Sequence, residues 1–340
     1  MTLARAEQVA EALLYEGYML YPYRPSAVKN RQRFNFGVIY PAGTSEAGDA
    51  MEDGAAIQTE CLVRGSADTV LEIRARFLQL VERTILGRDA MPVACLEAEG
   101  RSWVPWIEAK EREVVVPPTS IGVLLDGRRV GFAFPTSEQV EAISDQSQRQ
   151  IGSILRRQQT LAGELECLAI PAGDDVFRIR VRIVNNTAMP ADRAVRDRLL
   201  LHSLVSVHTI LGVRDGDFIS LTDPPASLRD VAQACHNIRT WPVLVGGHGE
   251  HDTMLSSPII VADYPEIAPE SPGELFDGTE IDEILSLRIL TLTDEEQREM
   301  TAADERARAL LERTRGLAAE QLMRMHGTMR APRTDGGEMR

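Results

Sequence analysis

The sequence predicts an α+β protein whose first half is an antiparallel β-sheet or sandwich behind one N-terminal helix, and whose second half is mixed and ends in helices. Three observations support this. Alternating apolar and polar runs recur at roughly 10–20-residue spacing in the first half, with no helix between most of them. Residues 161–184 carry a hairpin pattern, and Thr293 with Glu296 forms a capping box that begins a helix.

Composition places the chain among globular proteins. It has 340 residues, of which 44% are hydrophobic and 26% charged, which excludes a disordered chain, a fibre and a disulfide-rich miniprotein. The net charge of −14 disfavours binding to nucleic acid and to an anionic membrane surface.

The first elements are predicted from apolar periodicity. A helix is expected over residues 3–16, ending at Gly17, and a strand over residues 33–40. A long strand is expected over residues 69–85, although the same run also has a helical period and a helix stays open. The next expected elements are short strands over 103–107, 113–116 and 129–134 and a polar helix over 137–148.

The hairpin is predicted over residues 161–170 and 176–184, because the turn between them contains the Gly and Asp that such turns require. Its second strand places arginines on one face and apolar residues, which should be buried, on the other. The two sets are Arg178, Arg180 and Arg182, and Phe177, Ile179, Val181 and Ile183.

The second half is predicted to be mixed. Its expected elements are a helix over 192–211, a strand over 218–221, a helix over 227–235, strands over 242–245 and 258–262, and helices from Thr293 to His326. Between them, residues 263–283 hold prolines among acids and predict an extended loop, or a docking strap laid against a partner or against the Arg-rich strands. The expected divisions are 1–187, 188–292, 293–327 and a disordered tail over 328–340.

Residues 21–36 are the densest local feature, since cations alternate there with aromatic rings. Such spacing suits single-stranded nucleic acid, an acidic patch on a partner or on this chain itself, or an ordinary strand entry. We expect a protein-partner surface here, formed by Tyr21, Tyr23, Arg24, Lys29, Arg31 and Arg33.

Histidines gather between residues 202 and 252, and His and Cys are good ligands for transition metals. The alternative metal site would consist of Cys235, His236, His248, His251 and Asp252. Neither H-x-x-x-H on a helix nor C-x-x-C is present, however. We therefore expect no metal and no organic cofactor.

The N-terminus lacks the apolar stretch of a signal peptide, because Glu7 and Glu11 interrupt it. The longest apolar candidate, residues 199–213, is shorter than the ~20 residues a membrane span needs. A cytoplasmic protein without membrane insertion is the expectation.

Three stretches carry a family resemblance: LLYEGYMLYPYRPSAVKNRQRFNFGV near the start, HTILGV…FISLTDPP in the middle, and SSPII…YPEIAPESPGELFDGTEIDEILSLRILTLTDEE near the end. The chain resembles, over most of its length, an uncharacterised family encoded in gene clusters for [NiFe] hydrogenases of the actinobacterial, high-affinity uptake type. The resemblance implies an accessory, assembly or structural role beside the hydrogenase and assigns no catalytic residue.

Two functional hypotheses follow. The first is a non-enzymatic accessory protein that acts through contacts with a protein partner, such as a hydrogenase subunit or maturation factor, or with a second copy of itself. The second is a metal-dependent enzyme or metal-delivery factor that uses residues 202–252.

Overall fold

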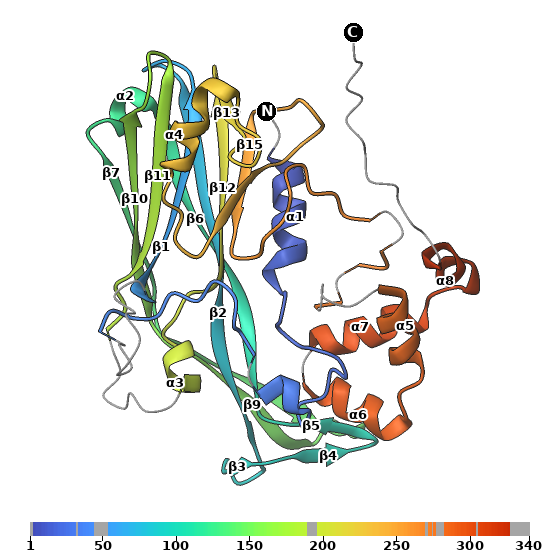
Figure 1. The fold of residues 1–340 in the computed structure, drawn as a ribbon. Helices are drawn as coiled ribbons and strands as arrows, with labels where there is room; N and C mark the ends of the chain where they lie inside the picture. Colours follow the sequence, from blue (N-terminus) through green and yellow to red (C-terminus); the bar gives the residue numbers. More distant parts are fainter. Residues whose placement is uncertain are drawn as a thin grey trace.

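Two antiparallel β-sheets face each other, and helices cover the outer face of one of them (Figure 1). The computed structural model describes residues 3–31, 33–43, 54–188, 196–268, 271–273, 275–276, 282–303 and 305–326. This arrangement confirms the predicted α+β class, with sheets dominating the first half and helices ending the chain.

The first sheet has the strand order β13–β1–β11–β10–β7. Its strands are β1 (Ala56–Arg64), β7 (Arg128–Phe134), β10 (Leu161–Pro171), β11 (Val176–Asn185) and β13 (Asp217–Ile219). The predicted hairpin is confirmed as β10 and β11, with Leu165 opposite Ile183. Ile179, Val181 and Ile183 are buried and Phe177 is half-buried against the same core.

The outer face of this sheet carries the three arginines of β11, as predicted. Arg180 donates to the buried carboxylate of Glu60 at 2.6 Å, and Arg182 pairs with Glu166 at 3.2 Å. Glu60 also accepts a hydrogen bond from the backbone N–H of His236 at 2.7 Å. The buried carboxylate therefore holds the loop after α4 (Arg229–Gln233) against the sheet, because an uncompensated charge there would be costly.

The second sheet is built on the long strand β2 (Val70–Leu86). Its order is β14–β15–β12–β2–β9–β8, and β3 and β6 also pair with β2. The strands are β3 (Pro92–Val93), β6 (Trp106–Ser120), β8 (Ser137–Ser144), β9 (Gln150–Gln158), β12 (Val205–Arg214), β14 (Trp241–Leu244) and β15 (Thr253–Ser257). A separate ribbon pairs β4 (Leu96–Ala98) with β5 (Arg101–Trp103).

The core lies between the two sheets, and β2 shows how it is built. Ile73 and Phe77 point inward and contact residues such as Cys61 and Ile179 of the first sheet. Leu78 and Leu80 face the opposite side and contact the helical layer. Burying each such side chain contributes about 1.5–3 kcal/mol. The alternation of β2 thus specifies both layers, and the open helix alternative is wrong for this segment.

The helical layer begins with α1 (Ala4–Leu14), whose Val9 and Ala10 contact Ile210 and Leu255 on the outer face of the second sheet. The C-terminal helices are α5 (Asp282–Leu290), α6 (Asp294–Ala303), α7 (Glu305–Arg315) and α8 (Ala319–Met325). The capping box is confirmed: Glu296 N–H donates to Thr293 Oγ1 at 3.3 Å, and Thr293 N–H donates to Glu296 at 2.9 Å. α5 begins at the end of the extended segment expected over residues 263–283 and continues beyond it. The sequence analysis did not predict this helix.

The predicted helix over 192–211 is wrong in its described part. Only α3 (Arg196–Leu200) is helical, and β12 follows. β12 is buried on both faces over Val205–Val213, so its apolar residues are nearly continuous and also satisfy a helical period.

Other local predictions differ for similar reasons. The polar helix expected over 137–148 is wrong: Ser137–Ser144 form β8, which is exposed at every position but Ile143 and is held to β9 by Arg157–Glu138 and Arg156–Glu141 ion pairs. Residues 33–40 contribute only a bridge from Ile39 to Leu204, and the expected strand over 258–262 lies instead at β15. The remaining short elements are a 3₁₀ turn at Val28–Arg31, α2 (Ile121–Leu124), a 3₁₀ turn at Ala226–Leu228 and α4 (Arg229–Gln233).

The sheets also cross the expected division at residue 187. β13 completes the first sheet, and β12, β14 and β15 complete the second, so residues 205–257 belong to the same sandwich as the first half. The expected tail over 328–340 lies outside the described residues. In the part of the chain that is described, no helix has the length and apolar character to cross a membrane.

Candidate functional site

The N-terminal segment, the lower end of the second sheet and the C-terminal helices meet in an aromatic cluster. Tyr15 and Tyr18 stand edge to face at 5.4 Å, and Phe34 and Phe276 lie 5.7 Å and 6.0 Å from Tyr18. The buried hydroxyl of Tyr23 donates to the carbonyl of Leu275 at 2.6 Å. Segments some 240–260 residues apart in sequence therefore share one core.

Arg33 is an internal part of this cluster. Its guanidinium carbon lies 3.6 Å from the centre of the Trp106 ring and 4.7 Å from that of Phe34. It donates to the carbonyls of Tyr18 and Ile107 at 3.3 Å and 3.2 Å. A desolvated guanidinium between rings and carbonyls makes strong, directional contacts. Arg33 and Tyr23, two of the six residues expected at a partner surface, thus point inward.

The other members of that set lie against the helices. Arg24 pairs with Glu296 of α6 at 3.1 Å. This contact agrees with one alternative from the sequence analysis, in which the cationic segment contacts acidic residues of this same chain. The Tyr21 ring contacts the guanidinium of Arg288 in α5 at 5.2 Å. Lys29 is exposed, and Arg31 ends the adjacent 3₁₀ turn. The segment is held to α5 and α6 and presents Lys29 to solvent.

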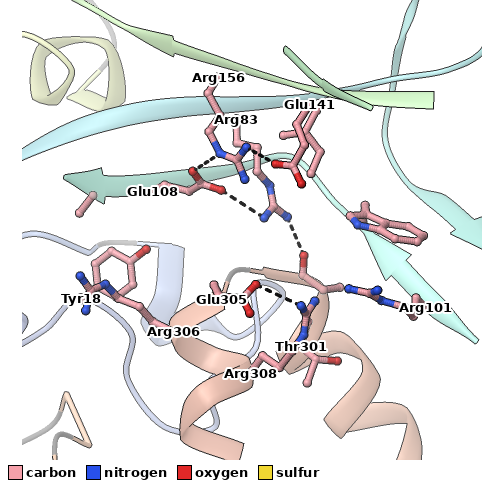
Figure 2. Close-up of a pocket in the computed structure, with 14 residues that line it drawn as sticks. Tyr18, Arg83, Arg101, Glu108, Glu141, Arg156, Thr301, Glu305, Arg306 and Arg308 are labelled. Carbon is pink, nitrogen blue, oxygen red and sulfur yellow. Dashed lines mark hydrogen bonds and ion pairs between the residues drawn. The ribbon is translucent and has the colours of Figure 1, made fainter. Parts of the chain in front are cut away.

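Beside the aromatic cluster lies a hollow of about 230 Å³, which we name the arginine pocket (Figure 2). The second sheet and the β4–β5 ribbon form one wall, and the junction of α6 and α7 forms the other. The described residues that line it include five arginines and three glutamates: Arg83, Arg101, Arg156, Arg306 and Arg308, with Glu108, Glu141 and Glu305.

Arg83 joins the two walls of the arginine pocket. Its side chain is only 5% exposed and pairs with Glu108 at 3.3 Å. The same guanidinium donates to the carbonyl of Val104 at 2.6 Å and to that of Ala302, at the end of α6, at 2.6 Å. The Arg83 guanidinium therefore offsets the partial negative charge at the C-terminal end of α6. Its own charge is compensated by Glu108 and its N–H groups have hydrogen-bond acceptors.

Arg156 and Arg308 lie at the solvent-exposed side of the arginine pocket, which we call its mouth. Arg156 contacts Glu108 at 2.7 Å and Glu141 at 2.6 Å. Burial opposes the charged form of Arg156, but these hydrogen bonds outweigh it and raise its pKa. Arg308 contacts Glu305 at 3.1 Å and the Thr301 carbonyl at 3.3 Å. Both cations are therefore held in place by carboxylates at the mouth.

The residues of the alternative metal site do not lie together as that hypothesis requires. The His248 ring lies 4.9 Å from that of Tyr264 at a tilt of 41°, and the backbone N–H of His236 donates to Glu60. Burial raises the pKa of the Cys235 thiol to about 11, with Glu60 adding to the effect, so it is not a ready thiolate. Asp252 accepts from Thr253, and His251 is exposed. Among the described residues, no three His, Cys, Asp or Glu side chains converge to hold a metal.

Sequence reasoning missed the arginine pocket altogether. The only available signal was the mixture of arginines and glutamates in β2 and β6. Their meeting with Thr301 and Arg308 depends on how the C-terminal helices dock, which no local pattern reports. No protein-family model matches the chain, and no curated protein shows significant sequence similarity to it.

Proposed function

We propose that this protein works by contact, as a cytoplasmic accessory, assembly or structural protein that binds a subunit or maturation factor of a [NiFe] hydrogenase. The hydrogenase link rests on the resemblance of residues 13–38, 208–225 and 256–296 to a family encoded beside such enzymes.

The observation that carries a contact function is the outward face of α5. This helix buries Leu285 and Ile289, yet it also exposes Ile284, Leu287 and Leu290, at one-turn spacing. α8 contacts α5 and leaves Met323 exposed (Figure 1). Apolar side chains aligned on an exposed helix face are typical of surfaces that dock a protein.

The N-terminal segment extends this surface with charge. The Tyr21–Arg288 contact places the segment against α5, and Val28 and Lys29 at its tip are exposed. Arg33 and Tyr23 act here as internal supports that fix the position of the tip. A rigidly held tip loses little conformational entropy on docking, which favours protein recognition.

Affinity purification of the tagged full chain from its source organism, under gentle conditions, tests this function. Mass spectrometry should identify the hydrogenase large or small subunit, or a maturation factor, and Lys29→Glu should reduce the recovery. Lys110→Glu is the matched control, because Lys110 is the chain's other lysine and is exposed on β6. If the wild type recovers no hydrogenase component and deletion of its gene leaves hydrogen uptake unchanged, the proposal is wrong.

A further inference from the structure

The arginine pocket has more arginines than glutamates among its described lining residues, and its least exposed glutamate is shared between two of those arginines. Glu108 serves both Arg83 and Arg156. Glu111, just outside the hollow, serves both Arg76 and Arg306. Among the described lining residues, five guanidinium groups thus face three carboxylates, in a chain whose net charge is −14. A local reversal of the overall charge attracts anions to one place.

The remaining carboxylates stand at the mouth and are well solvated. The side chains of Glu141 and Glu305 are 62% and 85% exposed, whereas those of Arg156 and Arg308 are each 27% exposed. Exposed ion pairs contribute little, because solvent screens them and the long side chains lose entropy. An incoming anion can therefore displace these two carboxylates from the arginines at small cost.

Arg101 adds a further cation at the same mouth. Its guanidinium carbon lies 5.2 Å from the centre of the Trp103 ring, and none of the described carboxylates forms an ion pair with it. Trp103 also lines the hollow and supplies a flat wall. Arg101, Arg156 and Arg308 thus border one opening from three different elements, as Figure 2 shows.

We propose that the arginine pocket binds a small oxyanion carrying at least two negative charges, of the phosphate or dicarboxylate class. Guanidinium groups donate paired hydrogen bonds to the oxygens of either class, and Glu141 and Glu305 already place carboxylate oxygens on Arg156 and Arg308. A hollow of about 230 Å³ suits a small anion rather than a folded segment. This inference does not depend on the hydrogenase link.

Isothermal titration of the full chain at fixed ionic strength tests the proposal, with inorganic phosphate and malonate as separate probes. The wild type should bind at one saturable site, and the probe that binds more tightly assigns the class. Glu141→Gln and Glu305→Gln remove the competing carboxylates, and each should tighten binding about two- to fivefold. Glu138→Gln, on the same strand β8 but paired with Arg157, is the matched control and should leave the affinity unchanged.

Loss-of-charge variants give the opposite readout. Arg156→Gln with Arg308→Gln should weaken binding at least tenfold. Because that variant also loses structural ion pairs, Arg101→Gln is added: its side chain is exposed, so the fold should persist while affinity falls about two- to fivefold. The proposal is overturned if neither probe saturates the wild type. It is also overturned if Glu141→Gln, Glu305→Gln and Arg101→Gln all bind like Glu138→Gln.

Discussion

Arg83 donates a hydrogen bond of 2.6 Å to the carbonyl of Ala302, across 219 positions of sequence. The contact ties the central strand of the second sheet to the end of α6, and Glu108 compensates the buried charge. The C-terminal helices are therefore attached to the sandwich by a specific polar contact as well as by apolar packing.

Replacing Arg83 should loosen this attachment. We expect Arg83→Met to lower the free energy of unfolding by about 3 kcal/mol, because several buried acceptors lose their donor. Chemical denaturation measures the loss, and hydrogen exchange should rise in α6 and α7. Arg157→Met, which breaks the exposed pair with Glu138, should cost less than about 1 kcal/mol. Equal costs for the two variants would contradict the assignment.

Arg33 should depend on guanidinium geometry rather than on charge alone. Arg33→Lys keeps the charge but loses the planar contact with Trp106 and one of the two carbonyl hydrogen bonds. We expect a loss of about 1–2 kcal/mol in unfolding free energy. Arg101→Lys should change the free energy of unfolding little, because the Arg101 guanidinium is exposed and lies 5.2 Å from the centre of the Trp103 ring. A neutral effect of Arg33→Lys would argue against the buried cation–ring contact.

His208 should make stability depend on pH. Burial lowers the pKa of this imidazole from 6.5 to about 4, although the Ser206 carbonyl opposes the shift and Arg76 adds to it. Between these two values the unfolded chain binds a proton that the folded chain does not. His208 should therefore cost about 3 kcal/mol of stability as pH falls from about 6.5 to about 4, with no cost above that range.

Unfolding free energies of the wild type and His208→Gln, measured at several pH values between 7 and 4, check this dependence. The wild type should lose more stability than the variant as pH falls. Parallel curves would show that His208 is not the titrating group.

The metal hypothesis has a direct test of its own. We expect the double variant His248→Ala, His251→Ala to melt within about 3 °C of the wild type, since loss of a structural metal would cost several kcal/mol. Metal analysis of protein purified without chelator accompanies the melting curves. One tightly held transition metal per chain, lost in the variant, would instead support the metal-dependent function.

The sequence predicted those elements in which one face is buried and the other solvated. The β10–β11 hairpin alternates cleanly, and β2 does so over Val70–Arg76, before both of its faces become buried at Phe77–Val81. β12 has no such contrast because both of its faces are buried, and β8 is the reverse case because it is exposed at every position but Ile143. Hydropathy periodicity reports a difference between two faces, so it fails where the faces are alike.

The candidate site was predicted only in part. The cation–aromatic segment was found because its residues are neighbours in sequence, but the inward direction of Arg33 depends on Trp106. The arginine pocket needed contacts among β2, β6, β9 and α7, and distant contacts of this kind leave no local pattern.

Direct binding of the purified protein to purified [NiFe] hydrogenase is the measurement on which the contact function depends. Surface-immobilised wild type should bind the enzyme saturably, and Leu287→Lys, on the exposed face of α5, should raise the dissociation constant at least tenfold. Val123→Lys is the control, since Val123 is similarly exposed on α2, away from the C-terminal helices (Figure 1). No saturable binding by the wild type, or equal binding by the two variants, would contradict docking through α5.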